Sequence, residues 1–230
     1  MHLRFSVWLF WVLLAGAARG QQGIGVQWEP EFSYTVKPAP RWSANLKLAV
    51  RNSFAEPTET GTASTYQLNY TQAQLFATYN LWTSTQLTGG YGFRFNDLLE
   101  SSIGREHRLM EQVSFLVYVG GTRLANRFRA EQRFIDTGYR NRWRYRIAYE
   151  MPLQGQRLDP GEQYLITANE VLYSFNAREH FGENRLYLGM GWYSNAKRKL
   201  EAGLQYRLEA IGTGRPEHVL WLTTAFYLNQ

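Results

Sequence analysis

The sequence predicts an all-β protein: a transmembrane, antiparallel, up-and-down β-barrel of about 10–12 strands that follows an N-terminal signal peptide. Polar and apolar residues alternate along segments of roughly nine to fourteen residues, which is close to the length of a tilted strand crossing a bilayer. The 230 residues contain no cysteine, which excludes a disulfide scaffold. Eight Trp and fifteen Tyr indicate a protein that meets a membrane interface.

Residues 1–20 predict a secretory signal peptide. His2 and Arg4 precede an apolar run from Phe5 to Leu14, and small residues follow it. That run is too short to span a membrane comfortably, so an anchor is the weaker interpretation. The barrel is expected to occupy residues 21–230 as one domain.

The first predicted strand, Val26–Val36, contains Pro30, which cannot donate a ladder hydrogen bond and therefore indicates an edge or irregular element. A regular strand is expected at Arg41–Ser53, after a turn marked by Pro38 and Pro40. A polar surface loop and a tight hairpin follow, at Phe54–Thr65, Tyr66–Leu81 and Thr83–Phe95.

Three glycines, Gly89, Gly90 and Gly92, lie within the second arm of that hairpin, where we expect them to make room for bulky neighbours inside the barrel. A polar loop is predicted at Asn96–Gly104, followed by a strand at Glu106–Val119.

The clearest pattern is the predicted hairpin Leu124–Tyr149, which follows a turn at Gly120 and Gly121. One face of each arm is almost wholly charged, and the other is largely aromatic and aliphatic. The charged positions are Arg127, Arg129, Glu131 and Arg133 in the first arm, and Arg140, Arg142, Arg144 and Arg146 in the second. Simple registry sets Glu131 near Arg142, Arg129 opposite Arg144, and Arg127 opposite Arg146.

The last third predicts a loop and then four strands, at Met151–Glu162, Tyr164–Asn176, Arg185–Trp192, Leu200–Glu209 and His218–Leu228. Every proline except Pro30 falls in a predicted connection. The count of about eleven candidates conflicts with the even number found in single-chain bacterial barrels. Either the Pro30 segment is not a full strand, leaving ten, or one strand is hidden, making about twelve; Trp28, Phe32 and Tyr34 favour the larger number.

With the apolar face outside, the interior is basic, and its charges must pair, bind water or hold an anion. The predicted lumen charge network consists of Arg127, Arg129, Glu131, Arg133, Arg142, Arg144, Arg146, Glu106, Arg108, Glu170 and Arg185. Two interpretations remain open: a small conduit that favours anions, or a closed salt-bridge plug with a structural role.

Four segments, Arg127–Arg133, Arg142–Arg146, Asn169–Glu170 and Glu183–Gly189, resemble an uncharacterised bacterial outer-membrane β-barrel family, domain of unknown function 2490. The resemblance covers most of the mature chain. It implies a barrel in the outer membrane of a Gram-negative cell, with no established activity. Outer-membrane lipid, the barrel-insertion machinery and small anions are the expected partners.

Three other functions can be compared with the residues. A lipid-modifying hydrolase would need a Ser, a His and an acidic or amide group, but His107, His180 and His218 have no partner spacing that singles them out. No metal-ligand, P-loop or dinucleotide pattern appears, so no cofactor is expected. The predicted signal argues against nucleic-acid binding. A soluble periplasmic lipid-binding barrel would place its apolar faces inward.

Overall fold

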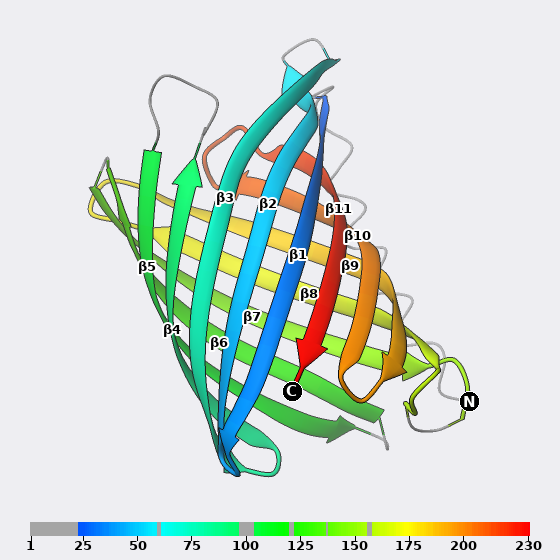
Figure 1. Cartoon of the computed structure of the whole chain (residues 1–230). Helices are drawn as coiled ribbons and strands as arrows, with labels where there is room; N and C mark the ends of the chain where they lie inside the picture. Colours follow the sequence, from blue (N-terminus) through cyan, green and yellow to red (C-terminus); the bar gives the residue numbers. More distant parts are fainter. Residues whose placement is uncertain (1–22, 59–60, 97–103, 120–121, 137, 156–157) are drawn as a thin grey trace.

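The computed structural model describes residues 23–58, 61–96, 104–119, 122–136, 138–155 and 158–230. In this part of the chain, eleven strands form a closed barrel (Figure 1). The strands are β1 (Ile24–Ala39), β2 (Trp42–Thr58), β3 (Gly61–Trp82), β4 (Thr85–Asn96), β5 (Gly104–Val119), β6 (Thr122–Ile135), β7 (Gly138–Pro152), β8 (Gln163–Phe175), β9 (His180–Asn195), β10 (Arg198–Ile211) and β11 (Glu217–Asn229). The predicted signal peptide, residues 1–20, lies outside the described residues.

The barrel closes through a parallel ladder between β1 and β11, whereas all its other neighbouring strands are antiparallel. The eleven candidate strands of the sequence are therefore confirmed in the described chain, and the expectation of an even number is wrong. In an up-and-down barrel with an odd number of strands, the first and last strands run in the same direction, and a parallel ladder can join them. The start of β1 and the end of β11 consequently lie at opposite ends of the barrel (Figure 1).

Pro30 does not reduce β1 to a partial strand, contrary to one prediction. It lies opposite Thr224 in the parallel ladder with β11. The ladder with β2 omits two β1 residues, since the pair Trp28–Asn52 is followed by Glu31–Ala49. The missing N–H therefore interrupts one ladder locally, while the strand continues on both sides.

The predicted surface loop Phe54–Thr65 is also wrong for its described residues, because β2 and β3 stay paired as far as Thr58 and Gly61. Three prolines predicted in connections, Pro38, Pro57 and Pro152, lie within strands instead. Each is at or next to a strand end, where a lost ladder hydrogen bond costs little. Most of the predicted loop Asn96–Gly104 and the Gly120–Gly121 turn lie outside the described residues.

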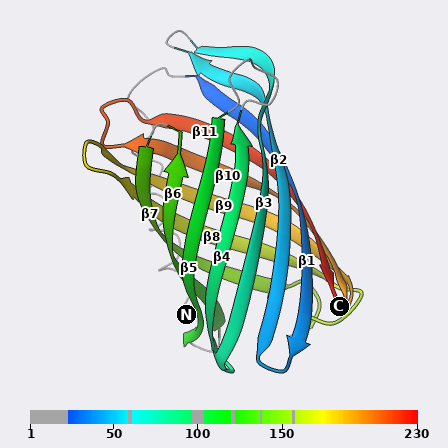
Figure 2. The ribbon, with the colours of Figure 1, turned by 60° about the vertical axis from the view of Figure 1, so that its left-hand side comes forward.

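The strands are strongly tilted about the barrel axis (Figure 2). Following the paired partners once around the wall from Ile24 leads to Ala39, at the other end of the same strand. This stagger is the register shift that closing a sheet into a barrel requires. Because of this shift, inward side chains that meet inside the barrel lie near the start of one strand and near the middle or end of another.

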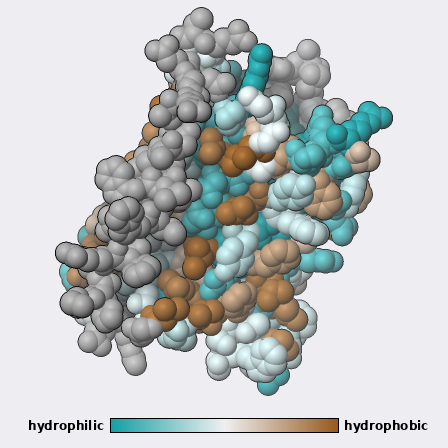
Figure 3. Space-filling model, turned by 180° about the vertical axis from the view of Figure 1, so that it is seen from behind, coloured by the Kyte–Doolittle hydropathy of each residue, from teal (hydrophilic) through white to brown (hydrophobic). Residues whose placement is uncertain are grey.

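Alternate residues of each strand face opposite sides of the wall. Large apolar side chains are exposed on the outer side, including Leu75 and Leu188, each 58% exposed. Figure 3 shows hydrophobic side chains spread over the visible outer face, among weakly polar ones. In the described part of the chain, no helix is long and apolar enough to cross a bilayer.

Glycine creates space for aromatic rings inside the barrel, as predicted for Gly90, but the prediction is wrong for Gly89. A Cβ on Gly90 would lie 2.4 Å from the ring of Phe76, and one on Gly191 would lie 2.1 Å from the ring of Tyr164. Both rings are buried. By contrast, a Cβ on the adjacent Gly89 would meet no atom within 4 Å.

This difference predicts unequal effects of two neighbouring substitutions. Gly90→Ala should lower the free energy of unfolding by about 1–3 kcal/mol, because the added methyl group overlaps Phe76. Gly89→Ala should change it by less than about 0.5 kcal/mol. Urea unfolding followed by tryptophan fluorescence measures both. Equal effects of the two substitutions would contradict the inward placement of Phe76.

Candidate functional site in the barrel interior

The register predicted for the arginine hairpin is confirmed. Arg127 is paired with Arg146, Arg129 with Arg144, and Glu131 with Arg142 in the β6–β7 ladder. Like charges directly opposite one another destabilise a sheet, so this hairpin needs carboxylates from elsewhere.

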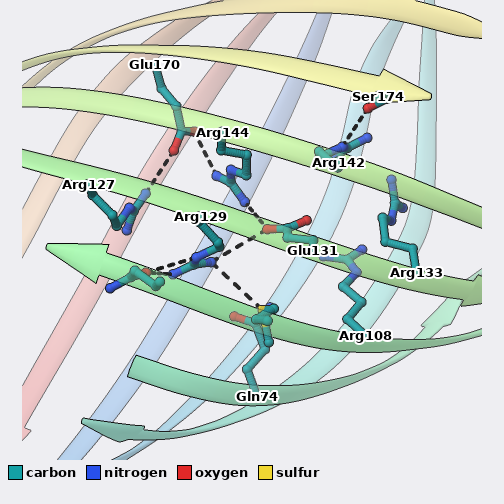
Figure 4. Close-up of polar contacts among 12 residues, drawn as sticks. Gln74, Arg108, Arg127, Arg129, Glu131, Arg133, Arg142, Arg144, Glu170 and Ser174 are labelled. Carbon is teal, nitrogen blue, oxygen red and sulfur yellow. Dashed lines mark hydrogen bonds and ion pairs between the residues drawn. The ribbon is translucent and has the colours of Figure 1, made fainter. Parts of the chain in front are cut away.

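Glu131 and Glu170 neutralise much of this positive charge, and both bind Arg144. Its Nη1 donates to Oε1 of Glu131 at 2.8 Å, and its Nη2 donates to Oε2 of Glu170 on β8 at 2.7 Å (Figure 4). Arg127 donates to the other oxygen of Glu170, also at 2.8 Å. Arg185 on β9 approaches Glu170 at 3.6 Å. One buried carboxylate therefore serves three guanidinium groups.

Glu106 plays the same role at the β5–β6 boundary. Arg133 binds it with both Nε and Nη2, at 2.5 and 2.9 Å. Arg108 donates to it at 2.5 Å, and Arg94 of β4 lies 3.9 Å away. Glu106 is only 1% exposed, so these contacts supply the compensation that a buried carboxylate requires.

Aromatic rings extend this network across the closing ladder. Tyr70 of β3 donates a hydrogen bond to Glu29 of β1, and Glu29 also accepts from Arg51 of β2. The Arg51 guanidinium lies over the ring of Trp221 on β11, 3.6 Å from its centroid. Arg207 of β10 stacks on the same ring. For Arg51 the cation–π contact adds to a single ion pair in the described chain, with Glu29, whereas Arg207 also lies within 3.7 Å of Glu183 and Glu209.

Together these residues form what we call the interior ring, which has at least one member on every strand. Contacts between its members join each strand to the next from β1 to β11, and Trp221 of β11 also contacts Arg51 of β2, on the far side of β1. The members are Glu29, Arg51, Tyr70, Arg94, Glu106, Arg108, Glu131, Arg133, Arg144, Glu170, Glu183, Arg185, Arg207 and Trp221.

The interior ring surrounds a cavity of about 730 Å³. Its lining contains fourteen Lys and Arg side chains but only eight Glu side chains. Adding the buried Glu106 and Glu131 brings the carboxylates to ten, so the interior keeps four cations in excess. Such an arrangement attracts anions and disfavours cations.

All eleven residues of the predicted lumen charge network face the interior, and nine of them line this cavity directly. Sequence analysis missed Tyr70 and Trp221 as partners of Arg51, and it also missed the contact of Arg207 with Trp221. A signal existed for Trp221, because it shares the inward register with Thr223 and Tyr227. Nothing in the sequence places its ring beside β2.

The three histidines of the described chain, His107, His180 and His218, lie outside the cavity lining. His107 hydrogen-bonds with Tyr91 at 2.5 Å, and His218 with Tyr206 at 2.7 Å. The ring of His180 lies 6.3 Å from that of Tyr173. Among the described residues, no His, Cys, Asp and Glu side chains gather in a group that could hold a metal ion.

A charged residue in the middle of β5 faces outward, and sequence analysis overlooked it. Glu111 of β5 is exposed between the exposed Leu109 and Val113, opposite Gly89 and Ala130. In the described part of the chain, its carboxylate has neither an ion pair nor a hydrogen bond. Its odd-numbered position in the β5 alternation predicts this outward direction.

Comparison with known proteins gives one family. A family model described as a protein of unknown function (DUF2490) matches residues 28–217. No curated protein and no solved structure matches the chain.

The sharing of Glu170 by three arginines predicts a large effect of neutralising it. Glu170→Gln should lower the free energy of unfolding by about 3–5 kcal/mol, because it leaves buried guanidinium groups uncompensated. Glu179→Gln removes the exposed partner of Arg140 and should cost less than about 1 kcal/mol. Chemical denaturation of the two variants compares them directly. A small effect at Glu170 would show that the interior charges are neutralised by other means.

Proposed function

The chain belongs to the DUF2490 family of proteins of unknown function, and we propose that it is a small outer-membrane pore that favours anions. The observation that carries this proposal is the cavity with its excess of cations, enclosed by a barrel whose outer wall is apolar. Outer-membrane barrels have this sidedness, with an apolar outer band and a polar lumen.

The outer wall supports the membrane location. Trp42, Trp82 and Trp143 are each about half or more exposed, and so are many aliphatic residues. Such a surface is costly in water but stable in hydrocarbon. A lipid-binding barrel would instead place apolar side chains around its cavity, whereas this cavity is lined mainly by charges. Outer-membrane lipid and the barrel-insertion machinery are the partners that this location implies.

The interior supports the preference for anions. Lysine and arginine side chains outnumber the ten carboxylates in the interior, and Arg142 and Arg146 have no ion-pair partner among the described residues, so an entering anion meets uncompensated positive charge. An entering cation meets the same charge as repulsion. The signal peptide predicted at residues 1–20 is consistent with export to the outer membrane.

A second candidate is an occluded barrel with a structural role in the envelope. The interior ring favours it, because ionic and cation–π contacts tie all eleven strands together from inside. A lipid-modifying hydrolase has less support, because in the described part of the chain His107 and His218 hydrogen-bond with tyrosines and His180 has a ring contact with Tyr173.

The sidedness can be tested at two adjacent residues of β9. The chain has no cysteine, so single labels can be placed at Leu188→Cys, which faces outward, and at Tyr187→Cys, which lines the cavity. In liposomes, nitroxide-bearing lipid should quench the fluorophore at 188 and leave that at 187 largely unaffected. A water-soluble quencher that reaches both positions equally would refute the membrane location.

The anion preference can be tested in planar bilayers. In a KCl gradient, the purified protein should give a current whose reversal potential has the sign of chloride selectivity. Arg140→Gln removes a cation of the cavity lining and should reduce that selectivity. Arg178→Gln is the control, because Arg178 is exposed between β8 and β9 and lies outside the cavity. If correctly inserted protein passes no current, the occluded barrel replaces the pore.

A further inference from the structure

Two arginines of the cavity differ from the rest. In the described chain, no carboxylate lies within ion-pair distance of Arg142 or Arg146, although both line the cavity. Both are on β7, and Arg144 lies between them. A guanidinium group inside a barrel without an anionic partner is energetically costly, so the reason for each needs to be found.

Arg146 lacks a partner because its nearest carboxylate is already saturated. Its ladder partner on β8 is Glu170. Oε1 of Glu170 accepts from Arg127, and Oε2 accepts from Arg144 and also lies near Arg185. On the other side, the β6 ladder partner of Arg146 is Arg127, which adds positive charge.

Arg142 lacks a partner because its side chain is directed away from its ladder neighbour Glu131. Its Nε donates to the hydroxyl of Ser174 at 2.8 Å (Figure 4). Oε1 of Glu131 is engaged by Arg144 and Arg129. The two terminal nitrogens of Arg142 therefore have no acceptor in the described part of the protein.

We propose that Arg142 and Arg146 are two oxyanion-binding positions, one on each side of Arg144, that take phosphate, sulfate or a carboxylate. This inference rests on the proposed function and assigns its anion contacts. Four residues of an extended strand separate the two positions by about 13 Å along β7. The intervening Arg144 is a structural residue, because both of its terminal nitrogens are bound to glutamates.

Oxyanions fit these positions better than halides do. The planar guanidinium fork presents parallel N–H groups that match two oxygens of a phosphate or carboxylate. A bound oxyanion would supply the negative charge that no carboxylate of the described chain provides to Arg142 and Arg146. Two such positions in one cavity would also give a permeating anion two successive binding sites, one on each side of Arg144.

Equilibrium dialysis with inorganic phosphate, at low ionic strength and on the full detergent-solubilised barrel, tests the proposal. The wild type should bind two equivalents. Arg142→Gln and Arg146→Gln should each lose one, with at least a tenfold loss of affinity at the altered position, and the double variant should lose both. Arg146→Lys should retain its equivalent with reduced affinity. Arg178→Gln is the matched control, because Arg178 is exposed and lies outside the cavity, and it should bind as the wild type does.

Folding of each variant is checked independently, because loss of an unpaired cation should not weaken the barrel. Arg142→Gln and Arg146→Gln should unfold in urea at or above the wild-type midpoint, whereas Arg144→Gln should unfold below it. A double variant that is folded and still binds two equivalents overturns the assignment, as does a wild type that binds none.

The outcome is separable from that of the pore. Two phosphate equivalents that depend on Arg142 and Arg146, in a barrel without current, would uphold the two positions and refute the pore. An anion-selective current with phosphate binding unchanged in the double variant would uphold the pore and refute the two positions.

Discussion

The structure depends on compensating many guanidinium groups inside a narrow enclosed space. A soluble sheet could leave the arginine face of the β6–β7 hairpin in water, but this barrel turns that face inward. In the interior ring, one carboxylate neutralises several guanidinium groups: Glu106 and Glu170 each lie within ion-pair distance of three arginines. Because every strand contributes, the charges that could have opposed closure instead hold the wall together.

The odd strand number and the interior ring are parts of the same solution. The parallel β1–β11 ladder places Glu29 of β1 and Trp221 of β11 on adjacent strands, and both contact Arg51 of β2. The closing ladder is therefore joined twice, by backbone hydrogen bonds in the wall and by ionic and cation–π contacts inside. Pro30 is tolerated there because both neighbouring strands continue on either side of it.

The proposed anion binding depends on a difference between the paired and the unpaired arginines of β7. Arg144 forms ion pairs with two carboxylates, whereas Arg142 and Arg146 on the same face of β7 form none among the described residues. The first kind of arginine holds the barrel together, and the second kind remains available to an anion. A pore and a structural plug are thus distinguished by how many arginines stay uncompensated, since both would contain the same ring.

The sequence by itself determined which segments form strands, which face of each strand points inward and the register of the arginine hairpin, but it did not determine the lengths of β2 and β3, which extend into the predicted loop at 54–65. These follow from the alternation of polar and apolar residues along each strand and from the short interval between β6 and β7, both of which are local properties of the sequence. Only the tertiary structure decided the parallel closure, the place of Pro30 and the contact between Arg51 and Trp221. Those depend on strands far apart in the chain that meet when the wall closes. The same holds for Arg142 and Arg146: alternation points every β7 arginine inward, but the distances to shared carboxylates determine which of them remain unpaired.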